Sequence, residues 1–232
     1  MCGRYSLTTP VEGIRRLFGF AELVPGLNPG NLPARYNIAP TQAAPVVRRG
    51  GDGRRELALL RWGLVPFWAK DASIGSRLIN ARAKTVPDKP AFRAAFRSRR
   101  CLVVADGFYE WRKLGDGKQP YRVTLADGGP FAFAGLWERW APAAAGEAIE
   151  SFAIVTTDAN ARLRPIHERM PVILDPADHE TWLDGGPAAL ALLRPFPGDA
   201  LAVYAVDRRV NNPRHDDPAC LAPLPAGADL PA

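Results

Sequence analysis

The chain begins Met1-Cys2-Gly3, which places a cysteine directly after the initiator methionine. A small second residue permits removal of Met1, and Cys2 would then carry a free α-amine beside its thiol. The pKa of such an amine is about 7.7–8.0 and that of a thiol is about 8.5, so part of the amine is neutral near pH 7. An aldehyde can form an imine with this amine, and the thiol can then close a five-membered thiazolidine ring. The competing interpretation is a cysteine without a role near a frayed terminus.

Three more polar residues stand where site residues often project. Glu110 is a charged residue inside an aromatic segment, and His167 lies between an expected helical turn and an expected strand. An acid in such a strand must face solvent, pair with a cation or line a cleft, and burial in a cleft raises its pKa toward acid–base use. Asn80 follows an apolar pair and opens a basic stretch. Each of these residues, taken alone, fits a structural role as well as a catalytic one.

Four aromatic residues fit either the core or a stacking surface for nucleic-acid bases, namely Trp62, Phe67, Trp68 and Trp111. Metal chemistry is not expected, because the sequence has only three histidines and lacks both paired Cys-x-x-Cys and His-Glu-x-x-His spacing. A phosphate-binding glycine loop is absent too, since residues 50–53 are not followed by Lys-Ser or Lys-Thr. We therefore expect no metal and no cofactor.

The positive charge is concentrated in one stretch. The chain has 30 basic and 24 acidic residues, and residues 82–100 alone contain seven basic residues and one acid. A local surplus of this kind suggests a polyanionic partner, most often nucleic acid, and it fits a solvated basic helix equally well. With three cysteines, no apolar run long enough to span a bilayer and no apolar signal region, we expect a cytoplasmic protein with no membrane contact, associated with the nucleoid when bound to DNA.

Positioning these residues requires a scaffold, and the hydrophobic pattern predicts one rich in strands. We expect a helix from Pro10 to Phe18 with Thr9 as its N-cap, a long loop over residues 25–45, short helices near 90–97, 176–183 and 188–193, and a helical turn at 158–163. The predicted strands are 3–7, 44–48, 56–62, 101–105, 108–113, 121–125, 131–138, 151–157, 171–174 and 201–207. The sequence thus predicts a single α+β domain with a strand-dominated, barrel-like core over residues 1–212, followed by a loose Pro/Ala-rich tail over 213–232.

Seven motifs, taken in order, resemble the SOS response-associated peptidase (SRAP) domain family over nearly the whole chain. They are Met1-Cys2-Gly3-Arg4-Tyr5, Arg35-Tyr36-Asn37-Ile38-Ala39-Pro40-Thr41-Gln42, Trp62-Gly63-Leu64-Val65-Pro66-Phe67-Trp68, Ile79-Asn80-Ala81-Arg82-Ala83, Gly107-Phe108-Tyr109-Glu110-Trp111, Phe133-Ala134-Gly135-Leu136-Trp137 and Ile166-His167-Glu168-Arg169-Met170-Pro171-Val172. Two departures from the family pattern are Lys84, where Glu is common, and Val104, where Pro is common.

The resemblance implies a protein that binds single-stranded DNA and crosslinks itself to abasic sites, shielding the lesion during the DNA-damage (SOS) response. In the family the N-terminal cysteine, here Cys2, forms a thiazolidine with the ring-opened sugar. The family's Asn, Glu and His correspond to Asn80, Glu110 and His167, which position or protonate the sugar. Further positions matched to DNA contacts are Arg4, Arg82, Arg169, Trp68 and Trp111.

The expected partner is therefore single-stranded DNA with abasic sites, bound by a monomer, and strand-cleaving lyase activity is left open. The family name carries an alternative, an autoproteolytic N-terminal-nucleophile thiol peptidase in which Cys2 attacks an amide and His167 is the base. A second alternative is a non-catalytic nucleic-acid-binding module that uses only the basic stretch. Neither alternative explains why Cys, Asn, Glu and His occupy these motif positions together.

Overall fold

A computed structural model describes residues 2–20, 22–24, 27–28, 32–115, 117–142 and 146–225. Five strands form a closed barrel: β4 (Ala43–Arg49), β5 (Arg55–Trp62), β7 (Arg100–Ala105), β10 (Phe131–Trp140) and β11 (Ile149–Asp158). In the order β5, β4, β7, β10, β11, each strand pairs with the next in antiparallel orientation. A parallel pairing of β11 with β5, at Phe152 and Trp62, closes the ring. The expected α+β domain with a strand-dominated, barrel-like core is confirmed.

The sequences of the barrel strands β7 and β10 are nearly continuous apolar runs, because both faces of these strands are covered. All six residues of β7 are buried, and α3 (His179–Asp184) packs on it, with the Trp182 indole donating to the Cys101 carbonyl at 2.9 Å. Gly135 in β10 leaves no room for a side chain, since an added Cβ would lie 2.6 Å from Val103 Cγ2. Burial of such strands on both faces is the usual reason why alternation is lost from their sequence.

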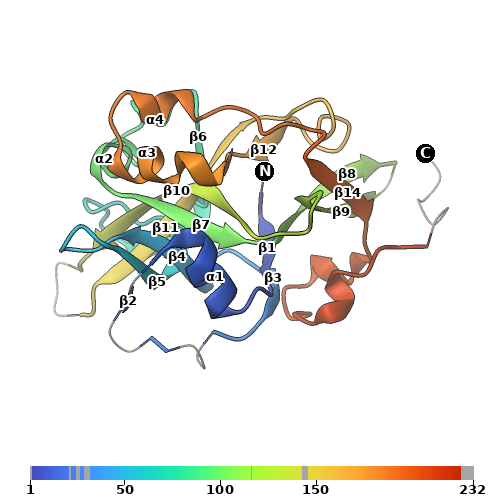
Figure 1. The fold of residues 1–232 in the computed structure, drawn as a ribbon, viewed down its shortest axis with the longest axis horizontal. Helices are drawn as coiled ribbons and strands as arrows, with labels where there is room; N and C mark the ends of the chain where they lie inside the picture. The colour runs from blue at the N-terminus through green and yellow to red at the C-terminus, as the bar shows by residue number, and fades with distance from the viewer. Residues whose placement is uncertain are drawn as a thin grey trace.

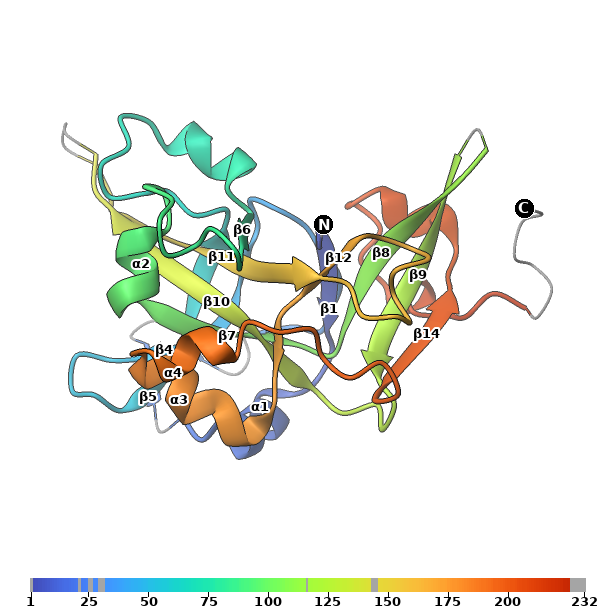
Figure 2. The same ribbon diagram turned by 90° about the horizontal axis from the view of Figure 1, so that it is seen from above.

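A second, antiparallel sheet lies beside the barrel in the order β14-β9-β8-β1-β3. Its strands are β1 (Arg4–Leu7), β3 (Arg35–Ile38), β8 (Gly107–Leu114), β9 (Gly117–Leu125) and β14 (Leu201–Ala205). In both views β8, β9 and β14 lie on one side of β1 and the barrel on the other (Figures 1 and 2). Tyr5 of β1 packs edge-on against Trp62 and Phe133 of the barrel, with ring centroids 5.1 and 5.9 Å apart. The N-terminal strand is thus fixed at the junction of the two sheets.

The remaining elements are short. They are α1 (Val11–Phe18), β2 (Glu22–Leu23), η2 (Ala72–Arg77), β6 (Asn80–Arg82), α2 (Arg93–Ser98), β12 (Arg169–Pro171), β13 (Ile173–Leu174), η3 (Pro176–Asp178), α4 (Ala188–Ala191), η4 (Arg208–Asn211) and η5 (Pro218–Cys220). No helix among the described residues is long and apolar enough to cross a membrane.

Several local predictions were wrong. Residues 35–38 and residue 43, assigned to a long loop, are strand, because β3 pairs with β1 and β4 with β5. The helical turn predicted at 158–163 lies a few residues further along: β11 continues through Asp158, and turns follow at 161–166, where the Arg164 N–H donates to the Asn160 carbonyl at 3.0 Å. Helix α1 has Pro10 at its N-cap position, and the Thr9 backbone instead donates to the Asp106 carboxylate at 3.2 Å.

The chain after Pro213 is packed as far as it is described, not loose as its composition suggested. The Asp216 carboxylate accepts hydrogen bonds from the backbone N–H groups of Tyr36 and Asn37 at 2.5 and 2.9 Å. Cys220 is fully buried, and Val206 forms a β-bridge with Pro223. Residues 226–232 of the expected tail lie outside the described residues. The domain boundary between 212 and 213 stays a prediction.

Candidate functional site

Cys2 lies two residues before β1, where the barrel and the second sheet meet, and its side chain is fully buried. The Asn80 side-chain amide donates to the Cys2 backbone carbonyl at 2.8 Å. Asn80 is held there by β6, which pairs in parallel with β11 so that Asn80 lies opposite Ile154. The two sequence motifs, 78 residues apart, are therefore joined by a direct hydrogen bond.

Glu110 comes from β8, the strand next to β1. Arg4 of β1 lies opposite Tyr109, so the next residue of β8 lies level with the N-terminal end of β1. Only 2% of Glu110 is exposed, and this burial raises the pKa of its carboxyl group, while the charge of His167 acts in the opposite direction. Burial also raises the pKa of the Cys2 thiol, and the negative charge of Glu110 adds to the effect. The strand register and the cavity that Glu110 shares with His167 place this carboxyl group close to both Cys2 and His167.

His167 stands at the end of the loop that joins β11 to β12. Its backbone N–H donates to the Leu163 carbonyl at 2.9 Å, and the Arg169 backbone N–H donates to the His167 Nδ1 at 3.0 Å. The Arg169 carbonyl lies 3.2 Å from the same Nδ1, so this nitrogen has a backbone partner whether or not it carries the ring proton. His167 and Glu110 line one cavity of about 550 Å³. The structure thus brings together all four residues expected to do chemistry.

Arg82 and Arg169 form a cationic pair beside this group. Both line a smaller cavity of about 270 Å³, together with Lys84 and Glu168. Burial lowers the pKa of Arg169, and the neighbouring positive charge of Arg82 lowers it further. Lys84 pairs with Asp158 at 2.8 Å. Two guanidinium groups that repel each other at a cavity wall would be stabilised by an anion between them.

Arg4 has a different environment from the one expected of a phosphate contact. Its guanidinium donates to the Asn37 side-chain oxygen at 3.0 Å and to the backbone carbonyls of Val210 and Asn211 at 2.6 and 3.0 Å. These bonds tie β1 to η4, and burial lowers the pKa of Arg4. In the structure Arg4 therefore holds the C-terminal segment, and its contact with DNA stays a prediction.

The two candidate stacking tryptophans differ in their distance from the site. Trp111 lines the same cavity as Glu110 and His167, and its indole N–H donates to the Asn211 side chain at 2.7 Å. Trp68 is 48% exposed beside Phe67, which is 57% exposed. The hydrogen bond of Trp68 goes to the Pro90 carbonyl at 3.3 Å, and no described contact joins it to Cys2 or Glu110. Trp62 is a core residue.

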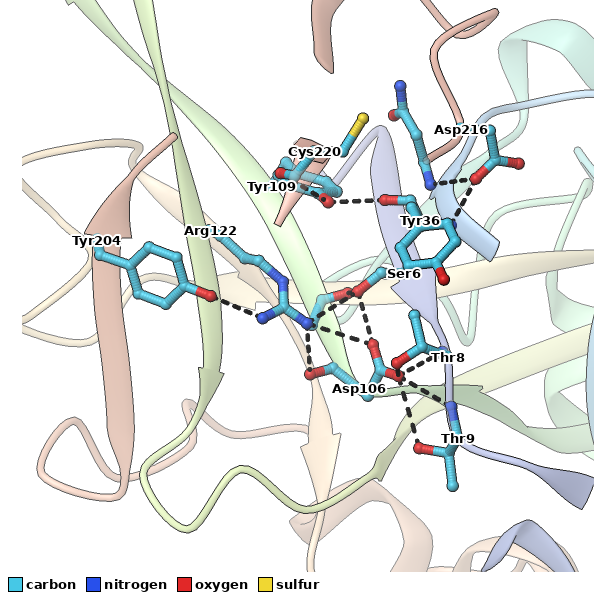
Figure 3. A network of polar contacts seen from close by, with 12 residues as sticks. Ser6, Thr8, Thr9, Tyr36, Asp106, Tyr109, Arg122, Tyr204, Asp216 and Cys220 are labelled. Carbon is cyan, nitrogen blue, oxygen red and sulfur yellow. Dashed lines mark hydrogen bonds and ion pairs between the residues drawn. The ribbon is translucent and has the colours of Figure 1, made fainter. Parts of the chain in front are cut away.

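Sequence analysis missed a buried carboxylate that fixes β1. Asp106 accepts hydrogen bonds from the hydroxyls of Ser6 and Thr8 at 2.6 and 2.7 Å and from the Thr8 backbone, and Arg122 lies 3.4 Å away (Figure 3). Arg122 in turn donates to the Tyr204 hydroxyl at 2.7 Å. The sequence carries a signal for this carboxylate, because Asp106 is an acid placed directly after the apolar run of residues 101–105 and just before the aromatic segment.

The basic stretch of residues 82–100 is only partly available to a ligand. Arg99 pairs with Glu138 at 2.7 Å, and Arg100 lies over the rings of Phe96 and Trp182 at 4.8 and 5.6 Å. These two charges serve the packing of α2 and α3 on the barrel. Within the described ranges no group of three or more His, Cys, Asp or Glu residues could hold a metal ion.

Comparison with known proteins gives consistent matches over the whole chain. The family described as SOS response associated peptidase (SRAP) matches residues 1–213. Abasic site processing protein YoqW of Bacillus subtilis (strain 168) is 40% identical over 223 residues, which cover 94% of this chain and 97% of that protein. Abasic site processing protein HMCES of Gallus gallus is 31% identical over 267 residues, covering 98% of this chain and 79% of that protein.

Solved structures agree with the fold. A crystal structure of a protein from Bacteroides thetaiotaomicron has a TM-score of 0.86 at 28% identity and covers 96% of this chain and 100% of that one. A second, from Bordetella bronchiseptica, has a TM-score of 0.74 at 31% identity and covers 89% and 100%.

Proposed function

This chain belongs to the SRAP family, the SOS response associated peptidases, and from that premise we propose that it processes abasic sites in DNA. More specifically, it binds single-stranded DNA and forms a covalent thiazolidine between Cys2 and the ring-opened sugar of the abasic site. The observation that carries this proposal is the convergence of Cys2, Asn80, Glu110 and His167 at one junction between the two sheets.

The proposed reaction has two bond-forming steps once Met1 is removed. The α-amine of Cys2 adds to the C1′ aldehyde of the open sugar, and loss of water from the resulting carbinolamine gives an imine. The thiol sulfur then adds to the imine carbon while the thiol proton passes to the nitrogen, which closes the five-membered ring. The net change is aldehyde plus amine and thiol giving thiazolidine plus one water. Consumption of the imine removes the species from which strand cleavage would proceed.

Glu110 and His167 are suited to move the protons of these steps. A buried carboxyl with a raised pKa exchanges its proton closer to neutral pH than an exposed one does, so Glu110 can accept a proton from the amine and return it to the departing oxygen. The His167 imidazole can donate a proton to the sugar oxygen when the closed hemiacetal opens. Asn80 fixes Cys2 through its carbonyl, and the Asn80 Oδ1 is buried without a hydrogen-bond partner among the described residues, so it can accept a bond from the Cys2 amine.

DNA phosphates are the anions that suit Arg82 and Arg169. Anchoring the strand on both guanidinium groups makes attack on the sugar effectively intramolecular, and orientation of this kind contributes as much as about 7–11 kcal/mol to rate. A single strand is the favoured substrate, because a missing base leaves an unstacked gap beside which Trp111 can stack.

The thiol peptidase alternative is less well supported by the electrostatics. A nucleophilic thiol in such enzymes is activated by a lowered pKa. Burial and the charge of Glu110 instead raise the pKa of the Cys2 thiol, and that thiol donates to the Arg4 backbone carbonyl at 3.9 Å. A thiol that stays protonated suits ring closure on an imine, in which its proton is passed to the nitrogen.

The proposal is tested by incubating the protein with an oligonucleotide that carries one abasic site and separating the products on a denaturing gel. Wild type is expected to give a heat-stable band of protein plus oligonucleotide. Cys2→Ala keeps the α-amine, so its adduct is expected only after reduction with borohydride. A heat-stable band of equal yield from Cys2→Ala without reduction would contradict the proposed ring.

A further inference from the structure

The hairpin formed by β8 and β9 carries a second group of basic side chains next to the site. The cavity of about 550 Å³ that is lined by Glu110 and His167 is also lined by four basic residues, Arg112, Lys113, Lys118 and Arg164. We call these four residues the hairpin surface, although Arg164 reaches it from the loop between β11 and β12. All four are exposed, and among the described residues none of them forms an ion pair. The acids of this cavity lining are Glu110 and Glu168, so its net charge is positive.

Two of these basic residues face each other across the hairpin, which lowers the stability of the hairpin. Lys113 of β8 lies directly opposite Lys118 of β9 in the antiparallel register. Like charges at facing positions of an antiparallel pair destabilise it, whereas opposite charges stabilise it. Arg208 adds a further positive charge, since its guanidinium lies 3.5 Å from where a Cβ of Gly117 would be. A ligand that carries several negative charges would relieve this repulsion.

The hairpin surface lies on the other side of Cys2 from Arg82 and Arg169. In both views β1 lies between β6, which carries Arg82, and the β8–β9 hairpin (Figures 1 and 2). Lys113 is three residues beyond Glu110 on the same strand, which corresponds to about 10 Å at the usual rise. Because successive side chains alternate, Lys113 points to the opposite face of β8 from Glu110, and Arg112 shares the face of Glu110. The cavity of Arg82 and Arg169 and the cavity of the hairpin surface share Glu168 as a lining residue, so the two are adjacent.

We propose that the hairpin surface binds the phosphates of the DNA strand on one side of the abasic site, while Arg82 and Arg169 bind those on the other side. This inference rests on the proposed function. It predicts a footprint that extends from the crosslinked sugar in both directions. Trp111, which shares a strand face with Lys113, would lie against the bases of the same half of the strand.

The test measures non-covalent binding to oligonucleotides that contain a tetrahydrofuran analogue of the abasic site, which has no aldehyde. Two half-length probes extend about six nucleotides to the 5′ side or to the 3′ side of the lesion, within the usual footprint of a single-strand binding surface. The double variant Lys113→Gln/Lys118→Gln removes two phosphate contacts, each of which contributes about 0.7 to the slope of log affinity against log salt concentration. Near 0.1 M salt, its affinity is therefore expected to fall about 25-fold for one probe only. Arg82→Gln is expected to weaken the other probe.

Arg93→Gln/Arg97→Gln is the matched control, because it removes the same charge from α2, at the far end of the molecule from the hairpin in both views (Figures 1 and 2). It is expected to keep wild-type affinity for the probe that the lysine variant weakens. The lysine variant is also expected to be at least as heat-stable as wild type, because the facing repulsion is gone. Equal losses on both probes, or none on either, would overturn the inference. Failure of the wild type to crosslink a reactive oligonucleotide would instead overturn the proposed function, whatever the half-length probes show.

Discussion

The hydrogen bond from Asn80 to the Cys2 carbonyl gives a quantitative expectation for the rate of crosslinking. Its length is 2.8 Å, and it joins a short strand attached to the barrel to a residue two positions before β1 of the second sheet. A neutral hydrogen bond of this kind contributes about 0.5–1.5 kcal/mol net. Asn80→Ala removes it, so the fraction of molecules with Cys2 in its reactive position falls by the corresponding factor, about 2- to 13-fold.

Asn80→Asp sharpens the test. A carboxylate cannot donate to the Cys2 carbonyl, and it would add a second negative charge close to Glu110. The new carboxylate is itself buried without a partner, and this costs a further 1–3 kcal/mol or so that Asn80→Ala does not incur. We therefore expect Asn80→Asp to be slower than Asn80→Ala by at least about fivefold.

The assay is single-turnover crosslinking with abasic oligonucleotide in excess, quenched at intervals and resolved on denaturing gels. Binding to the tetrahydrofuran analogue serves as the control and is expected to be the same for wild type and both variants, because Arg82 and Arg169 are untouched. Wild-type rates in both variants, or a faster reaction in Asn80→Asp than in Asn80→Ala, would refute the positioning role of Asn80.

Three further predictions concern His167, Arg82 and His179. His167→Ala is expected to slow crosslinking or its reversal by up to about 10²-fold with little change in DNA affinity, and wild-type rates of both steps would remove His167 from the mechanism. Arg82→Ala is expected to flatten the log–log salt slope for single strands by about 0.7, so an unchanged slope with lower affinity would mean that Arg82 is not a phosphate contact. Burial lowers the pKa of His179 to about 4, below the ordinary 6.5. The unfolded chain therefore binds the proton first, and stability is expected to fall by up to about 3 kcal/mol as pH drops from 6.5 to 4. His179→Phe should lose much of this pH dependence in urea unfolding, and an unchanged dependence would exclude His179 as its source.

Much of the barrel could be predicted because its strands carry strong local signals. The runs ending at Ala105 and beginning at Phe131 are apolar enough to be recognised as buried strands, and β4 and β5 are separated by a clear glycine turn. The strand β3 was not recognised because its four alternating residues, 35–38, are flanked by Pro33 and Pro40 in a Pro/Gly/Asn-rich segment. Its hydrogen bonds depend on β1 and on Asp216, about 180 residues away. The packed segment after Pro213 was missed for the same reason: what holds it is long-range.

The site was predictable in its members but not in its geometry. Motif resemblance named Cys2, Asn80, Glu110 and His167, whereas nothing local to those motifs gives the bond between Asn80 and the Cys2 carbonyl. Arg4 illustrates the limit, since its partners lie more than 200 residues away at Val210 and Asn211. The charge on the β8–β9 hairpin was visible in the sequence, but its position beside Glu110 depends on how β8 pairs with β1.

The central claim is that both the amine and the thiol of Cys2 enter the product, and blocking the amine tests it most directly. Protein with a mature Cys2 terminus and protein with a non-cleavable extension before Cys2 are incubated with the same abasic oligonucleotide, and the intact masses are measured. The thiazolidine account predicts that the mature form gains the mass of the oligonucleotide less the water released. It predicts no such adduct for the extended form, which still binds DNA. A heat-stable adduct of equal yield and the same mass gain in the extended form would contradict the account.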